Sequence, residues 1–286
     1  EIDVINTHSS TDAWLVALAG ASLSKCPPVV RTRHVSTSVN NSPLTRWLYL
    51  NGTQHIVTTG ERLRMQLHQE NAYPLARMTS IRTGIVLGRY VPGETMSARQ
   101  AAGIPDKPTI GILATLRSWK GHSLLLTAWQ TLSKKFPEWQ LLIVGDGPQR
   151  ANLEQQACQQ GLKDSVIFVG NQDNAEQWLA CMDIFSLPSY GNEGVPQGIM
   201  QAMACGLPVV STTIGAIDEA VQQGDTGFLN PAKDIPALTA SLEKLMSDAV
   251  LRRRMSEASL SWARQHFGEE KMLDSMERIF YSVVEP

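Results

Sequence analysis

The sequence predicts an α/β protein made of two doubly wound domains, the first of which is incomplete. Short apolar runs alternate with helical patterns along the whole chain, and this alternation is typical of parallel sheets whose strands are joined by helices. The runs are apolar throughout, which indicates that helices cover both faces of each sheet. A segment at residues 88–100, with Pro and Gly and few apolar residues, separates two such regions.

The first region predicts half of a doubly wound domain. Its strand-like runs lie at residues 3–7, 29–34, 55–59 and 81–84, and its helical patterns lie at 11–23, 43–51 and 61–70. A complete domain of this class is usually longer than about 95 residues. We therefore expect residues 1–95 to form a partial first domain.

The second region predicts a complete doubly wound domain over residues 96–268. Strands are expected at 109–115, 139–147, 166–170, 183–189, 207–212 and 227–230. Helices are expected at 124–132, 149–160, 175–181, 196–205, 216–222, 235–247 and 250–265, the first with apolar residues at i, i+4 and i+8. A last helix, 269–283 in the C-terminal segment 269–286, is expected to pack back toward the first domain.

The composition is that of an ordinary globular chain. Of the 286 residues, 43% are hydrophobic and 18% charged, and the net charge is −2. This balance excludes collagen-like and disordered classes and argues against a general nucleic-acid binder, which would be basic. We expect no signal peptide, and no stretch reaches the about 18–20 apolar residues that span a bilayer. Four cysteines without a CxxC pair predict buried free thiols and a reducing cytoplasm: Cys26, Cys158, Cys181 and Cys205.

The loop at residues 189–205 is the richest candidate for a ligand site. Ligands of open α/β sheets bind at the carboxyl ends of strands, near the starts of helices. This loop follows a predicted strand, Pro196 suits the first turn of the next helix, and Gly206 suits its end. The free N–H groups at that helix start favour an anion such as a phosphate.

Two polar residues flank this helix start. Glu193 lies in the loop, and Gln201 lies five residues beyond Pro196, a rise of about 7–8 Å along a helix. The two side chains suit different parts of one elongated ligand, although spacing alone also fits a solvated turn and a surface glutamine.

A second loop, 116–122, follows the first strand of the same domain. Arg117 and Lys120 stand beside Gly121 at a strand-to-helix junction. Two such cations suit a diphosphate, because Arg binds it as a fork and Lys as a point charge. Ordinary surface cations are the alternative.

Other motifs give weaker signals. The GDGP segment at 145–148 lacks the spacing of a dinucleotide fingerprint and favours a tight turn. The sequence contains no P-loop, no HExxH and no cluster of Cys and His with metal-ligand spacing. His8 and His34 each follow a predicted strand, where they suit either a site or a structural role.

Taken together, residues from about 110 to 219 resemble the donor-binding domain of family-4 glycosyltransferases of the GT-B fold. The resemblance rests on LRSWKGH, QLLIVGDGP, VIFVGN, MDIFSLPS, EGVPQGIMQAMACGLPVVSTTIGA and GDTGFLNP, which stand in the family's order. The segments DVINTHSS, HIVTTGE and SIRTGIVLGRYVP resemble the family's first domain and interdomain stretch. The fold that this implies is GT-B-like, with two Rossmann-like domains.

The resemblance implies an enzyme that moves a sugar from a nucleotide-diphosphate donor to an acceptor with retention of configuration. It implies that Lys120 neutralises the donor diphosphate, that Glu193 holds hydroxyls of the donor sugar, and that His8 faces that sugar. Backbone N–H groups along the stretch from Gly194 to Gln197, which includes Val195 and Pro196, would meet the sugar or phosphate. No metal and no cofactor are implied, because cations and helix-start dipoles stabilise the leaving diphosphate.

The chain departs from the family pattern at three places. Gln201 falls where the family has a second glutamate, and an amide still offers donors and an acceptor to ribose hydroxyls. Thr115 stands where many members carry an Arg, for which Arg117 would compensate. The strand and Gly-rich loop that begin the family's first domain are absent from this sequence.

Three functions remain open on this evidence. The first is a retaining glycosyltransferase of cell-surface polysaccharide or lipopolysaccharide biosynthesis, cytoplasmic or at the inner membrane face, acting on a glycan or lipid-linked acceptor. The others are a non-catalytic or truncated sugar-nucleotide binder and a sugar-nucleotide 2-epimerase. A set of aromatic and basic residues suits either peripheral membrane contact or ordinary core packing: Trp14, Arg46, Trp47 and Tyr49.

Overall fold

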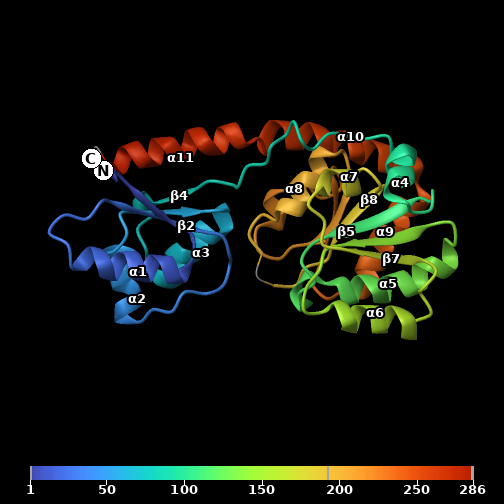
Figure 1. The fold of residues 1–286 in the computed structure, drawn as a ribbon, viewed down its shortest axis with the longest axis horizontal. Helices are drawn as coiled ribbons and strands as arrows, with labels where there is room; N and C mark the ends of the chain where they lie inside the picture. Colours follow the sequence, from blue (N-terminus) through green and yellow to red (C-terminus); the bar gives the residue numbers. More distant parts are fainter. Residues whose placement is uncertain (1, 192, 285–286) are drawn as a thin grey trace. The chain divides into compact units, whose positions relative to one another are not determined.

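The computed structural model describes residues 2–191 and 193–284, and these residues form two compact units (Figure 1). Unit 1 comprises Glu1–Gly84, Asn192–Val195 and Glu269–Pro286, and unit 2 comprises Ile85–Gly191 and Pro196–Gly268. The outermost residues of the predicted first domain and of the C-terminal segment, 1 and 285–286, lie outside the described residues, as does residue 192 of the glycine-rich loop.

Unit 1 contains a four-stranded parallel sheet in the order β1-β2-β3-β4. The strands are β1 (Ile5–Thr7), β2 (Val29–Arg33), β3 (His55–Thr58) and β4 (Met78–Ser80). They are joined by α1 (Ser10–Ala21), α2 (Pro43–Leu50), α3 (Glu61–Asn71) and the 3-10 turn η1 (Leu75–Arg77). Because right-handed crossovers that step in one direction fall on one face of a sheet, these helices share a single face, where their apolar residues form one core.

The opposite face of this sheet is covered by the C-terminal helix α11 (Glu269–Val284) (Figure 1). Its apolar residues recur at helical spacing and pack on Val30, Val57 and Ile81; they are Met272, Met276, Ile279, Phe280 and Val283. The predicted packing of the last helix onto the first domain is therefore confirmed.

The strand predicted at residues 81–84 is wrong. The fourth strand is β4, which pairs in parallel with Ile56, Val57 and Thr58 of β3. Two of the three residues of β4 are Thr79 and Ser80, whose polar side chains hide the strand in the sequence. Ile81 directly follows β4 and is buried on the face that α11 covers. This buried apolar residue explains why the sequence pattern placed the strand after residue 80.

Unit 2 contains a six-stranded parallel sheet in the order β10-β9-β8-β5-β6-β7. The strands are β5 (Thr109–Leu113), β6 (Gln140–Val144), β7 (Val166–Gly170), β8 (Ile184–Leu187), β9 (Val209–Thr212) and β10 (Gly227–Asn230). The chain steps from β5 outward to β7, then returns to β8 and steps outward on the other side to β10. The prediction of a doubly wound sheet is confirmed, and the order reverses between β5 and β8.

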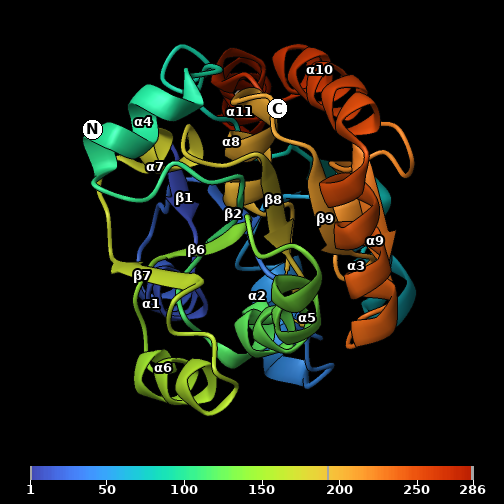
Figure 2. The same cartoon turned by 90° about the vertical axis from the view of Figure 1, so that its right-hand side faces the viewer.

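Helices cover both faces of this sheet (Figure 2). One face carries α5 (His122–Lys135), α6 (Arg150–Gln159) and α9 (Ile235–Ser247). The other carries α7 (Ala175–Leu179), α8 (Gln197–Ala204) and α10 (Ala249–His266), with α10 packed on α8. Trp129 of α5 is fully buried, and its indole N–H donates to Ser165 Oγ at 3.1 Å.

Two elements predicted in what is now unit 2 are wrong. The expected linker at 88–100 contains the helix α4 (Thr95–Ala102), whose first N–H groups donate to the Glu94 carboxylate. Arg99 of this helix is buried and pairs with Asp183 at 2.6 Å, a distant partner that local composition cannot indicate. The helix expected at 216–222 is only the 3-10 turn η3 (Ile217–Glu219), because the chain turns back at once, with Gln222 N donating to Thr226 Oγ1.

The cysteines follow the prediction only in part. All four are free, Cys181 and Cys205 are buried, Cys26 is half-buried and Cys158 is exposed. Cys158 lies next to Ala157 on α6, whose buried side is formed by Leu153 and Ala157, and the next position along a helix points away from that side. Among the described residues, no helix is both long enough and apolar enough to cross a bilayer.

Candidate functional site

The point where the strand order of unit 2 reverses brings two loops together. We call residues 114–121, after β5, the β5 loop, and residues 188–191, after β8, the β8 loop. Tyr190 N donates to Trp119 O at 2.8 Å. Gly121 has φ +79°, and a Cβ there would lie 2.1 Å from Pro188 O. Only glycine at this position allows the two loops to approach so closely.

The two predicted cations of the β5 loop lie in or next to one 3-10 turn. Lys120 closes the 3-10 turn η2 (Ser118–Lys120), with its N–H donating to Arg117 O at 3.1 Å. The Arg117 guanidinium is exposed and stands 5.7 Å from the centre of the Trp119 ring. Arg117 therefore directly precedes this turn and Lys120 ends it, with Gly121 between Lys120 and the first residue of α5.

His122, that first residue, adds no positive charge at neutral pH. The side chain is 1% exposed, and neither ring nitrogen has a hydrogen-bond partner within the described residues. Burial, together with the charge of Lys120, lowers the pKa of His122 to about 4. The net charge of this turn is thus set by Arg117 and Lys120.

The start of α8 lies over the end of β5. A Cβ added at Gly198 would stand 2.9 Å from Leu113 O, so the first turn of the helix touches the last residue of the strand. The helix begins at Gln197, with Pro196 as the residue before it rather than its first residue. Pro196 has no N–H to offer a ligand, and its carbonyl accepts from Ile199 and Met200. Gly206, at φ +77°, ends the helix as predicted.

Gln201 lies one turn further along α8, on the same side as the exposed Gln197. Its Nε2 donates to Tyr90 Oη at 2.9 Å. Tyr90 is 8% exposed and belongs to unit 2, although it lies 111 residues away in sequence. Sequence reasoning missed this tyrosine, because no motif spacing connects it with Gln201.

The remaining predicted residues belong to unit 1. His8 follows β1 and is exposed, and its Nδ1 lies 3.0 Å from Nε2 of His34, with the two rings stacked. Burial and the neighbouring His8 lower the pKa of His34. Glu193 is 4% exposed and Val195 6%, and both are grouped with Gly194 in unit 1. Val195 is joined directly to Pro196 of unit 2.

The aromatic and basic residues considered for peripheral membrane contact pack in or beside the core of unit 1. Tyr49 is 2% exposed and stacks on Tyr73 with ring centres 4.9 Å apart. Trp14 and Trp47 pack against the same core, and Arg46 donates to Asn71 O at 2.8 Å. Core packing is therefore the interpretation that the structure supports.

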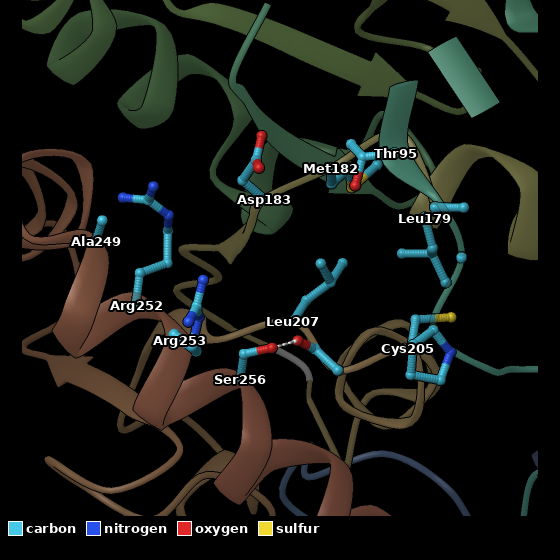
Figure 3. Close-up of a pocket in the computed structure, with 14 residues that line it drawn as sticks. Thr95, Leu179, Met182, Asp183, Cys205, Leu207, Ala249, Arg252, Arg253 and Ser256 are labelled. Atoms are coloured by element: carbon cyan, nitrogen blue, oxygen red, sulfur yellow. Dashed lines mark hydrogen bonds between the residues drawn. The ribbon is translucent and has the colours of Figure 1, made fainter. Parts of the chain in front are cut away.

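A cavity of about 330 Å³ lies near the amino ends of β8 and β9, at the other end of the strands from the β5 and β8 loops (Figure 3). It is bounded by Asp183 and Leu207, which precede β8 and β9, and by Arg252, Arg253 and Ser256 of α10. Most of its polar groups serve the fold: Asp183 accepts from Arg99 and Thr109, Arg252 donates to Leu245 O, and Ser256 donates to Gly206 O. We therefore do not assign it to the site at the strand reversal.

Two family models match the chain, one described as Glycosyltransferase Family 4 over residues 1–89 and one as Glycosyl transferases group 1 over residues 107–248. The N-acetyl-alpha-D-glucosaminyl L-malate synthase of Bacillus anthracis is 35% identical over 50% of this chain and 38% of its own length. The lipopolysaccharide core biosynthesis mannosyltransferase LpsB of Rhizobium meliloti is 27% identical over 89% of this chain and 74% of its own.

Among solved structures, Anabaena Alr3699/HepE in complex with UDP and glucose superposes with a TM-score of 0.87 at 21% identity, covering 98% of this chain and 78% of that one. The chain thus spans only part of the relatives that it matches, 38% of the Bacillus protein. The matched models, the order of the two parallel sheets and the superposition agree with the resemblance found in the sequence. The chain belongs to the family-4, group 1 glycosyltransferases, and it has the GT-B fold.

Proposed function

We propose that this chain binds a nucleotide-diphosphate sugar and transfers the sugar, with retention of configuration, to a glycan or lipid-linked glycan acceptor of the cell surface. The observation that carries the proposal is that the turn with Arg117 and Lys120 follows β5, while α8 begins over the last residue of the same strand, at the strand reversal of unit 2. Open α/β sheets bind ligands at this place. The structurally similar Anabaena protein was solved with UDP and glucose, which supports the same class of ligand here.

The diphosphate is assigned to the β5 loop and α8. As the bond between the sugar and the diphosphate breaks, negative charge grows on the leaving phosphate oxygen. Lys120 and Arg117 would offset this charge, and the first N–H groups of α8, which have no partner inside the helix, would donate to it. These groups supply positive charge without a bound metal, so we propose that the reaction is metal-independent.

The sugar is assigned to Glu193 and His8. The buried Glu193 carboxylate would accept hydrogen bonds from sugar hydroxyls, Gly194, Val195 and Gln197 would offer backbone groups, and His8 would contact the sugar. The acceptor hydroxyl attacks the anomeric carbon on the face that the diphosphate leaves, and its proton passes to the leaving phosphate oxygen. One glycosidic bond forms while one bond to phosphate breaks, without the paired carboxylates of a glycosidase.

We further propose that the protein works in the cytoplasm and meets lipid-linked acceptors at the inner face of the membrane. The free state of all four cysteines fits a reducing compartment.

Calorimetric titration with UDP-glucose and GDP-mannose tests the proposal. Lys120→Ala should weaken binding about ten- to hundredfold, the effect of losing a hydrogen bond to a charged group. Lys134→Ala is the matched control, because Lys134 is exposed in the last turn of the same α5 that follows Lys120; this variant should bind as tightly as the unchanged chain. Equal affinities for all three proteins would contradict the proposal.

A second candidate function is a binder without transferase activity. It is favoured by one observation, that Gln201 takes the place of a carboxylate and is already engaged with Tyr90. Glu193→Ala separates the two candidates: loss of a measurable sugar transfer in this variant rules out the binder, whereas donor binding with no transfer by the unchanged chain supports it.

A further inference from the structure

A second cavity of unit 2, also of about 330 Å³, lies at the carboxyl ends of its strands. It is lined by Arg117 of the β5 loop, Leu124 of α5, Leu153 of α6 and Lys233, which follows β10. We call it the α5 cavity. Its volume is within the range of about 300–1,000 Å³ that is typical of small-ligand sites. Among the described residues, neither Lys120 nor any residue of α8 lines it, so it is a different place from the one assigned to the diphosphate.

The charge that lines the α5 cavity is positive. Arg117 and Lys233 contribute two cations, and no acidic residue in the described part of the chain lines the cavity. Lys233 Nζ stands 4.7 Å from the centre of the Tyr190 ring, which belongs to the lining as well. Asp234, the neighbour of Lys233, accepts a hydrogen bond from the Ala237 N–H at 2.9 Å and caps α9. An anion in the cavity would therefore meet two cations and no carboxylate of the lining.

The start of α5 adds to this positive charge. The helix has 14 residues, no side chain caps its start, and its first turn contains no acidic residue. The first N–H groups of a helix have no partner inside it, and the positive end of the helix dipole attracts an anion. A Ser, Thr, Asn or Asp before the helix would normally satisfy one of these groups, but Gly121 stands there. These N–H groups can therefore donate to a ligand in the cavity.

His122 is a buried polar side chain without a partner. It lines the α5 cavity, it is 1% exposed, and neither ring nitrogen has a hydrogen-bond partner within the described residues. A buried polar group that stays unpaired lowers the stability of a fold. A neutral imidazole carries one N–H donor and one acceptor, so an anion in the cavity would supply the partner that this N–H lacks. This observation is independent of the helix start, and it too points to a ligand.

Lys233 holds a backbone conformation that suits glycine. Its φ is +64°, in the left-handed region where a residue with a Cβ is strained. Glycine would adopt this conformation without strain, yet the chain carries a lysine that lines the cavity. Strain of this kind is common at ligand sites. The lysine is therefore better explained by what it binds than by the stability of the loop.

We propose that the α5 cavity binds a phosphate group, as the free ion or as the phosphate ester of a sugar, separately from the diphosphate of the donor. Lys233 and Arg117 would pair with its charge, the first N–H groups of α5 would donate to its oxygens, and the N–H of the His122 ring would donate one further hydrogen bond. The apolar side chains of Leu124 and Leu153 would contact an attached sugar. Arg117 is assigned to both sites, so Lys233 and His122 are the residues that define this one.

The test follows the ring signals of His122 by NMR while inorganic phosphate is added to the unchanged chain in a buffer without phosphate. His122→Leu identifies these signals by their loss. Phosphate should shift them to a plateau. It should also raise the pKa of His122, which is about 4 without a ligand, by about one unit or more, because a bound anion favours the charged ring. The other charged or titratable groups that line the cavity or adjoin His122 are Arg117, Lys120, Tyr190 and Lys233.

A parallel titration with glucose 6-phosphate distinguishes the two sources of the phosphate group. Tighter binding of glucose 6-phosphate than of inorganic phosphate would assign the cavity to a sugar phosphate. Equal or weaker binding would assign it to the free ion.

Substitution of Lys233 tests the cavity itself. Lys233→Ala should weaken phosphate binding about ten- to hundredfold, the effect of losing a hydrogen bond to a charged group. Lys244→Ala is the matched control and should bind as tightly as the unchanged chain. Lys244 is also an exposed lysine of unit 2, with Nζ 5.1 Å from the centre of the Phe228 ring, but it does not line the cavity. Lys233→Gly gives a second measurement: it should also lose binding, and it should melt no lower than the unchanged chain, because glycine removes the backbone strain.

Three results decide the inference. The absence of a saturable shift of the His122 signals, or equal phosphate binding by Lys233→Ala and Lys244→Ala, would overturn it. Saturating UDP should leave the phosphate bound, and displacement of the phosphate by UDP would place it at the donor site and overturn the inference as well. A chain that binds phosphate in this way but binds neither UDP nor GDP would contradict the proposed function alone.

Discussion

Replacing Gly121 by alanine should separate the two loops that form the candidate site. A Cβ at this position would stand 2.1 Å from Pro188 O, about 1.3 Å short of ordinary contact at 3.4 Å. The obstructing atom belongs to the backbone, so one of the loops must move by about that distance. The left-handed conformation of an alanine costs about 1–2 kcal/mol, and overpacking costs about 1–3 kcal/mol more.

Gly103→Ala is the control for this substitution. Gly103 has φ +66° and nothing within 4 Å of an added Cβ, so its variant carries the conformational cost alone. For a unit of this size, each 1 kcal/mol lowers the melting temperature by about 2–4 °C. We expect Gly121→Ala to melt several degrees below Gly103→Ala and to bind UDP or GDP at least about tenfold more weakly, since Lys120 is displaced.

Thermal unfolding and calorimetric titration of the two variants provide the assay. If both melt at the same temperature and bind nucleotide equally well, the contact between the β5 loop and the β8 loop does not hold the site, and the reasoning is refuted.

Three further predictions concern protonation, thiols and metal. The pKa of His122 falls from 6.5 to about 4 on folding. As the pH is lowered, the unfolded state therefore binds a proton before the folded state does, and the free energy of unfolding should drop by about 3 kcal/mol between pH 6.5 and pH 4. His122→Leu should remove this drop in urea titrations at several pH values; the same dependence of unfolding free energy on pH in both proteins would contradict the prediction. Cys158 should react quickly with a thiol reagent in the native protein, whereas Cys181 and Cys205, whose pKa values burial raises to about 11 and about 12, should react only after unfolding; rapid labelling of all four would count against this packing. EDTA should leave the dissociation constant for UDP or GDP unchanged, and a large loss of affinity would contradict the proposed metal independence.

Much of the fold could be predicted from the sequence because most strands are buried apolar runs. Ile110 and Ile112 of β5, for example, are fully buried, and their apolar character follows from helices on both faces of the sheet. The strand β4 was missed for the opposite reason, since Thr79 and Ser80 are held by pairing with β3 rather than by their own propensity. Helix α4 was missed because its Arg99 is paired with Asp183, 84 residues away.

The candidate site could be predicted in part. The Gly and Pro residues of the two loops indicated strand ends and helix starts, and Arg117 and Lys120 do lie in or next to one 3-10 turn. The contact of Tyr190 with Trp119 depends on which strands are neighbours, and strand order is a tertiary property that spacing does not encode. The partner of Gln201 could not be found for the same reason.

The central claim is that the cationic turn of unit 2 binds the diphosphate of an activated sugar. Its most direct test is calorimetry of UDP and GDP against uridine and guanosine, with the unchanged chain and with Arg117→Ala/Lys120→Ala. The account predicts that a diphosphate nucleotide binds at least about tenfold more tightly than its nucleoside and that the double variant abolishes this difference. A difference that survives in the double variant, or one that is absent from the unchanged chain, would contradict it.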